Sequence, residues 1–275
     1  MTAATIKTCA LCNSSQPLRI SHIVPHFVFS SMKTGSLTGY LRSLDNPARR
    51  IQDGFKQELL CDACEQLFST WESSVSRQVY LPITTGLQSV IRYGQEYSRF
   101  AISVLWRVLV WRFNAFISVA PQFKGNVENI EREWRAFLLG KERKPGAASC
   151  HTVILSKNLI LGVGNVVGLT SDNFQRFLQR AVDVDVISDH RQPFVYAKLG
   201  RLLIFGLTPL EGNYRSSRVA LQNGVLGPGK YQVPLPILKA LTHNTERVFG
   251  AIEGLSDAQK QRINASINKN HAGRY

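Results

Sequence analysis

The stretch CDACEQLFSTWESSVSRQVY, residues 61–80, decides the fold of the N-terminal part of this chain. It opens with a CxxC pair, contains no proline or glycine, and repeats apolar side chains at helical spacing. The pattern predicts a helix over residues 62–79 that Pro82 ends. A second CxxC pair lies upstream in CALCN, residues 9–13, where the chain is expected to form a tight turn.

The two cysteine pairs predict a zinc site. Forty-eight residues separate them, and together they supply the four thiolates that tetrahedral zinc takes in a closed structural site. Four reduced buried cysteines or a redox dithiol are the alternatives, and no thioredoxin-like pattern surrounds the pairs. The predicted ligands are Cys9, Cys12, Cys61 and Cys64, while Cys150 is expected to be an inert buried thiol.

The charge of the chain indicates a polyanionic partner. Its 275 residues carry a formal net charge of +14, and 44% of them are hydrophobic, as in a globular protein. A surplus of this size favours nucleic acid, with an anionic membrane surface or a merely solvated basic surface as alternatives. A homo-oligomer or a protein partner stays open.

The most apolar run is FAISVLWRVLVWRFNAFISVA, residues 100–120. Arg107 and Arg112 interrupt it, whereas a membrane-spanning helix needs about 20 apolar residues with few charges. We therefore expect a buried helix, with the arginines snorkelling near its ends. The start of the chain lacks the apolar segment of a signal peptide, so a cytoplasmic location without a membrane is expected.

The whole pattern predicts an α+β protein. A treble-clef zinc module over residues 1–82 is expected to pack on a mixed body over residues 83–275. In that body the sequence predicts helices over 86–140, a linker over 141–149, strands over 150–210 and a helical tail over 235–269. The strand region includes HTVILS (151–156), LILGVGNVVGL (159–169), a helix NFQRFLQRAV (173–182) and a hairpin of FVYAKL and RLLIFGL around Gly200.

A histidine and a carboxylate flank the predicted zinc site. His22 lies in RISHIVPHF, residues 19–27, where a strand should leave the turn, and Glu65 follows the second CxxC pair. A histidine can act as a general base, and a carboxylate can hold Mg²⁺. The alternatives are a core histidine with a satisfied hydrogen bond and a first-turn carboxylate that the helix dipole favours.

The motif CxxC … SHIVP … LLCxxCE resembles the zinc-clipped branch of the HNH, or ββα-metal, endonucleases over residues 9–72. The resemblance implies that His22 is the general base and that Glu65 holds a catalytic Mg²⁺ or Mn²⁺. Asp53 could supply a further carboxylate if its loop folds back. The stretches SHIVPHFVF, TGYLRS and FAISVLWRVL also resemble bacterial HNH-endonuclease-like proteins, which implies a mobile-element or phage-defence role.

The chain departs from the HNH pattern at three positions. Ser21 stands where the family has an acidic metal ligand, Glu65 stands where it has His or Asn, and the middle asparagine is missing. The resemblance implies metal-dependent hydrolysis of DNA, whereas the departures favour the first of two alternatives. One is a non-catalytic zinc protein that binds nucleic acid, and the other is a protein-interaction module.

The segment between the predicted strand and helix supplies candidate nucleic-acid contacts. Residues 33–57 are polar and basic, and we expect a long loop with at most a short hairpin. Tyr40 and Phe55 lie among its cations, a mixture that suits phosphate contacts and base stacking. The predicted contacts are Lys33, Arg42, Arg49, Arg50 and Lys56, with Arg215 and Arg218 as a second patch.

Overall fold

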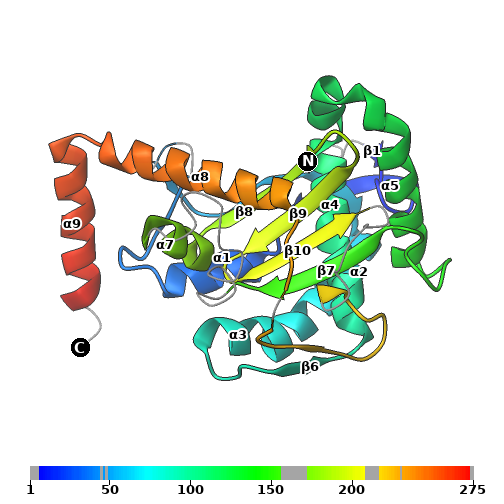
Figure 1. Cartoon of the computed structure of the whole chain (residues 1–275), viewed down its shortest axis with the longest axis horizontal. Coiled ribbons are helices and arrows are strands. Elements are labelled where there is room, and N and C mark those ends of the chain that lie inside the picture. The colour runs from blue at the N-terminus through cyan, green and yellow to red at the C-terminus, as the bar shows by residue number, and fades with distance from the viewer. Residues whose placement is uncertain are drawn as a thin grey trace.

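The computed structural model describes residues 6–43, 46, 49–155, 172–207, 217–229 and 231–272. Its centre is a four-stranded antiparallel sheet in the order β7-β10-β9-β8 (Figure 1). Helices from other parts of the chain cover both faces of this sheet, which confirms the predicted α+β class. The strands are β7 (Ser149–Ile154), β10 (Leu202–Leu207), β9 (Pro193–Leu199) and β8 (Val182–Ser188).

The central strands are apolar at successive positions because the sheet is buried on both faces. In β10, Leu202 and Ile204 join a core with helix α4 (Gln95–Val119). Leu203 and Phe205 point the other way and join a second core with α7 (Asp172–Arg180) and α8 (Leu235–Glu253). The predicted hairpin turns at Gly200, whose φ of 61° is in the left-handed region that glycine adopts without strain.

Helix α4 runs through the middle of the molecule. It packs against α2 (Asp62–Val75), α5 (Lys124–Leu138) and the sheet, and every residue from 100 to 109 is buried. By length and composition it is the one described helix that could cross a membrane, yet 61% of its most apolar window is buried inside the protein. The prediction of a buried helix is confirmed, but Arg107 is itself fully buried and does not snorkel.

The N-terminal module is built on a small antiparallel sheet in the order β1-β2-β5. Its strands are β1 (Ile6–Thr8), β2 (Ser15–His22) and β5 (Lys56–Cys61). The turn between β1 and β2 carries the first cysteine pair, and its Asn13 has a φ of 60°. Helix α2 begins directly after β5, as the sequence predicts.

The segment that links β2 to β5 contains one helix that the sequence did not reveal. Helix α1 (His26–Thr34) follows Pro25 and buries Val28 and Phe29. The predicted short hairpin is confirmed as β3 (Leu41–Arg42) paired with β4 (Arg50–Ile51).

Pro82 does not end the long helix, so this prediction was wrong. Helix α2 continues through a π-helical turn (Ser76–Tyr80) into α3 (Leu81–Thr85), which ends at Gly86 with a φ of 73°. Pro82 stands at the start of α3, after the wider π turn, where its missing N–H costs little. The π turn therefore lets the helix pass a proline.

The remaining body predictions are largely confirmed. Residues 86–140 are mainly helical in α4, a 3₁₀ turn (Pro121–Phe123) and α5, but Ile91–Tyr93 form strand β6, paired with β11 (Gly224–Leu226). Strands β7, β9 and β10, α7 and the helical tail are present where expected, whereas β8 was not predicted as a separate strand. The tail is divided into α8 and α9 (Asp257–Ala272). The stretch LILGVGNVVGL and Arg215 lie outside the described residues.

One core joins the cysteine module to the body. Cys9 and Leu11 of the first turn belong to the same buried cluster as Phe68 of α2, Trp106 of α4 and Ile204 of the sheet. The N-terminal module is therefore not packed as an appendage, although the domain boundary at residues 82 and 83 stays a prediction.

Candidate metal centre and its surroundings

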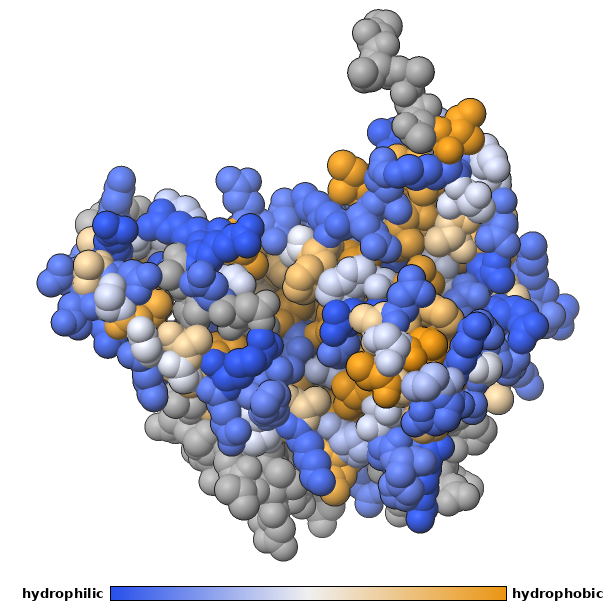
Figure 2. All heavy atoms as spheres, turned by 90° about the horizontal axis from the view of Figure 1, so that it is seen from above, coloured by the Kyte–Doolittle hydropathy of each residue, from blue (hydrophilic) through white to orange (hydrophobic). Residues whose placement is uncertain are grey.

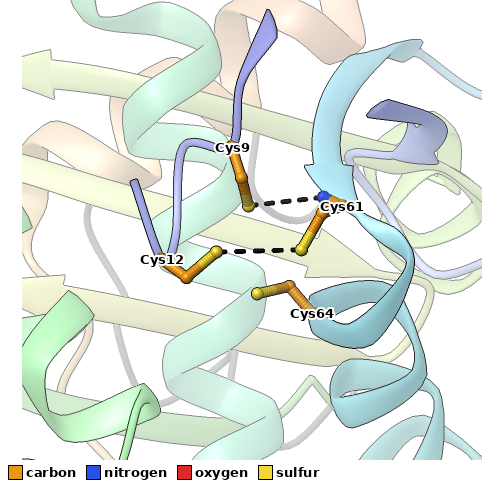
Figure 3. A group of neighbouring side chains, drawn as sticks. All are labelled: Cys9, Cys12, Cys61 and Cys64. Carbon is orange, nitrogen blue, oxygen red and sulfur yellow. Dashed lines mark hydrogen bonds between the residues drawn. The ribbon is translucent and has the colours of Figure 1, made fainter. Parts of the chain in front are cut away.

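The four predicted zinc ligands converge on one point (Figure 3). Cys9 and Cys12 come from the turn after β1, while Cys61 ends β5 and Cys64 lies in the first turn of α2. Their sulfur atoms all lie within 4.8 Å of one another, and all four thiols are free. Within the described ranges, no other group of three or more His, Cys, Asp or Glu side chains is placed to hold a metal ion.

The spacing of the sulfur atoms fits zinc. A tetrahedral site with Zn–S bonds of about 2.3 Å requires sulfur atoms about 3.8 Å apart. The Cys12 and Cys61 Sγ atoms are 3.7 Å apart, and the backbone N–H of Cys61 donates to Cys9 Sγ at 3.3 Å. Three of the cysteines are buried and Cys12 is half-buried, as in a closed structural site. The geometry of the four sulfur atoms therefore fits a metal ion such as zinc.

The pKa values of the thiols indicate that a cation would stabilise this cluster. Burial raises the pKa of the Cys9 and Cys64 thiols, because a desolvated thiolate is costly without a nearby positive charge. Burial would also raise the pKa of Cys12, but hydrogen bonds with Ser14, and after them those with Cys9 and Cys64, outweigh burial and lower the pKa to about 6. Zn²⁺ would supply the missing charge and stabilise all four thiolates.

His22 is the last residue of β2 and is held in place through its backbone. Arg107 Nη1 donates to the His22 carbonyl oxygen at 2.9 Å. The His22 Nε2 atom is buried and has no hydrogen-bond partner. Burial, and after it the charges of Lys56 and His26, lower the pKa of His22, so the imidazole is neutral near pH 7. A neutral imidazole can accept a proton, but this nitrogen has no contact with solvent.

Glu65 points to Ser21 rather than to a metal ligand set. The Ser21 hydroxyl donates to Glu65 Oε2 at 2.7 Å, and Ser21 is fully buried. These two residues occupy the positions that hold the catalytic metal in the HNH resemblance. The fold therefore brings the two positions together, but a hydrogen bond joins them directly.

Asp53 lies near His22 and has two basic side chains as partners. It accepts from Lys56 Nζ at 2.8 Å and faces His26 Nε2 at 3.4 Å. The hydrogen bond from Lys56 is the main reason why the pKa of Asp53 is lowered. His22, Asp53 and Glu65 thus form no preassembled three-ligand group, and these residues do not fit a ready-made Mg²⁺ or Mn²⁺ site. Their catalytic roles stay predictions.

An ion pair lies next to His22 at the position where the sequence analysis expected Arg107 to snorkel. Arg107 Nη2 donates to Glu72 Oε1 at 2.7 Å, so that this arginine links α4, α2 and the end of β2. The sequence signal for this ion pair was Arg107 inside an otherwise apolar helix, since a buried cation needs a partner.

The predicted nucleic-acid contacts lie around the β3–β4 hairpin. Arg42 and Arg50 are directly opposite each other in the hairpin, and the Arg50 guanidinium lies 4.2 Å from the centre of the Tyr40 ring. Arg49 is exposed beside them. Lys33 is half-buried in the last turn of α1, and Lys56 is paired with Asp53, so these two lysines are less available to a ligand.

Comparisons with protein-family models, curated proteins and solved structures give no match to this chain. The chain is an α+β protein whose four-cysteine cluster is placed to hold a metal ion such as zinc, and the argument for its function rests on its own residues.

Proposed function

We propose that this chain is a zinc-structured protein that binds DNA through basic residues carried by an HNH-like module. The observation that carries the proposal is the pairing of Arg42 with Arg50 across the β3–β4 hairpin. Like charges directly opposite each other destabilise a strand pair. Burial and the charge of Arg50 both lower the pKa of Arg42, which shows the same repulsion. Two neighbouring guanidinium groups of this kind suit a polyanionic backbone.

Zinc has a structural role in this proposal. The metal would hold the first turn against β5 and α2, and the hairpin is inserted between the strands that the metal joins. Arg49 and the aromatic ring of Tyr40 are exposed on the hairpin, so phosphate contacts and base stacking are both available there. The net charge of +14 favours the same class of partner.

Duplex DNA binding measured by fluorescence anisotropy over a salt series tests the proposal. The double variant Arg42→Gln/Arg49→Gln should weaken binding and reduce the slope of log K against log salt by about 2, since each phosphate contact contributes about 0.9. The matched control is Lys141→Gln/Arg143→Gln, which removes the same charge from an exposed turn of the body. Equal losses in the two variants would show that only net charge matters and would contradict a hairpin site.

Hydrolysis of DNA is the second candidate function, and His22 favours it. A half-buried neutral imidazole whose Nε2 atom is buried and unpartnered is a feature of general bases as well as of strained cores. Hydrolysis would require a local rearrangement that exposes Nε2 to water, because the atom is buried. The water would lose a proton to Nε2 as its oxygen forms a bond to phosphorus. The P–O bond to the leaving strand would break, and the released alkoxide would take up a proton from solvent.

A plasmid-nicking assay in Mg²⁺ and in Mn²⁺ separates the two candidates. If the chain is a nuclease, wild type should nick the plasmid and His22→Ala should be inactive while it keeps its zinc. His26→Ala is the matched control on the neighbouring exposed histidine. If neither metal supports nicking by wild-type protein that binds DNA, the binding proposal stands alone.

A further inference from the structure

Helix α9 (Asp257–Ala272) stands at one end of the molecule, beyond α8 (Figure 1). From Asp257 to Lys269 none of its residues is buried. The helix carries one acidic residue, Asp257 in its first turn, against Lys260, Arg262 and Lys269. A polar helix of this kind gains little from packing, so its side chains are available to a partner.

The hairpin holds one face of α9. Arg50 Nη2 donates to Ser266 Oγ at 3.0 Å, which joins residues 216 positions apart in the chain. Ser266, Ile263 and Ile267 are half-buried and lie on this inner face of the helix. The basic hairpin and the C-terminal helix, which are remote in sequence, therefore belong to one surface.

The outer face of α9 presents amide side chains between cations. Gln261, Asn264 and Asn268 are exposed and fall on one stripe at helical spacing, opposite the half-buried residues. Lys260 lies on one flank of that stripe, and Arg262 and Lys269 lie on the other. At this end, at the left in both views, the visible surface is predominantly hydrophilic (Figure 2).

We propose that α9 is a DNA-reading helix that enters the major groove. The inference rests on the DNA binding proposed above and deepens it by naming the element that reads sequence. An α-helix with its side chains is about 10–12 Å wide, and the major groove is about 12 Å wide. Asn and Gln side chains pair with the N6 and N7 atoms of adenine, while Lys and Arg on the flanks contact phosphates.

Two competing partners fit α9 less well. A helix that lies on a membrane needs a large apolar face, and the exposed stripe of α9 consists of amides and cations. Duplex RNA has a deep, narrow major groove that side chains cannot read. Duplex DNA is the partner whose shape and charge match this surface.

The test combines selection from a randomised duplex library with three variants. Wild type should enrich sites that contain adenine, and Gln261→Ala/Asn264→Ala/Asn268→Ala should lose discrimination by about tenfold or more while it keeps its salt slope. The variant Lys260→Gln/Arg262→Gln/Lys269→Gln should keep the base preference and lower the salt slope by about 3. The control Lys141→Gln/Arg143→Gln/Lys144→Gln removes the same charge elsewhere.

The outcomes separate this inference from the proposed function. If wild type does not bind duplex DNA at all, both are overturned. Binding that survives in the amide variant with unchanged base preference overturns only the DNA-reading role of α9. Equal affinity for duplex RNA would also contradict it. Because the substituted residues are exposed, circular dichroism and zinc content should match wild type in every variant.

Discussion

Cys61 and Cys64 lie where a strand passes directly into a helix, so hydrogen bonds fix the backbone on both sides of the metal centre. The first pair is held less firmly, in a turn closed by Cys9 N–H to Ser14 O and Asn13 N–H to Cys9 O. The CxxC spacing was sufficient to predict all four ligands, because a single turn can present both thiolates of a pair. The sequence also predicted that the two pairs meet in one site, but it did not show how, since that depends on the β2–β5 pairing.

Replacing Cys64 with serine should abolish stoichiometric zinc binding. Serine is a poor zinc ligand, and the three remaining thiolates leave an open, weaker site. We expect one zinc per chain in wild type by atomic emission, and much less in the variant together with a lower thermal midpoint. The control is Cys150→Ser, at a buried thiol in β7, which should be destabilised without losing zinc. Zinc loss in both variants would mean that the loss is an indirect result of unfolding.

Ser21→Asp tests whether the module has lost a metal site. The new carboxylate would face Glu65 in a buried place, and two like charges there are unfavourable without a cation. We expect a lower thermal midpoint than wild type without added metal and a larger rise on addition of Mn²⁺. Ser21→Asn has nearly the same shape without the charge and should respond much less. An equal Mn²⁺ response in both would contradict a latent site at this position.

The lowered pKa of His22 predicts a pH dependence of stability. Because burial and nearby cations disfavour the charged imidazole in the folded state, the folded pKa lies below the ordinary value of 6.5. The folded protein therefore keeps this contribution to its stability above pH 6.5 and loses it as the pH falls through the folded pKa of His22. Between pH 8 and pH 5, wild type should lose more unfolding free energy than His22→Gln. The exposed His243→Gln should behave as wild type.

At the scale of elements, the sequence predicted those that carry a clear hydrophobic period and missed those that depend on their neighbours. Helix α4 and the β9–β10 hairpin have patterns that only one structure satisfies. Helix α1 is short, and it is stabilised by burying Val28 and Phe29 against the module rather than by its own pattern. The π turn before Pro82 has no signature in a single sequence, since it depends on how the helix packs.

The Arg107–Glu72 ion pair joins α4 to α2, and its loss should lower the free energy of unfolding. The side chain of Arg107 is 2% exposed, and removal of one partner from a buried pair costs roughly 3–5 kcal/mol. We expect Arg107→Met to lower the free energy of unfolding by an amount of that order in urea titrations. On the same helix, Arg112→Met breaks an ion pair with Asp185 that is about one-third exposed and should cost about 1 kcal/mol or less. Similar costs at both positions would contradict a special role for the buried pair.

At the scale of the whole molecule, composition predicts the class of partner, and the tertiary structure decides which residues form the surface that binds it. The surplus of 33 Lys and Arg over 19 Asp and Glu predicts the class of partner from composition alone. Composition could not show that Arg50 reaches Ser266, because contacts between distant segments depend on the complete fold. The surface that we assign to DNA is thus a property of the tertiary structure, although each of its residues is an ordinary polar side chain.

The continuous core predicts that zinc removal affects the whole chain. Because the buried cluster runs from Cys9 through Phe68 and Trp106 to the sheet, loss of the metal should weaken packing well beyond the module. With a chelator present, tryptophan fluorescence and far-ultraviolet circular dichroism should follow one shared thermal transition at a lower midpoint. Hydrogen exchange is the measurement that would contradict this prediction. If chelation removes protection only from β2, β5 and α2 while β9 and β10 stay protected, the module unfolds alone and the boundary near residue 82 separates two independent domains.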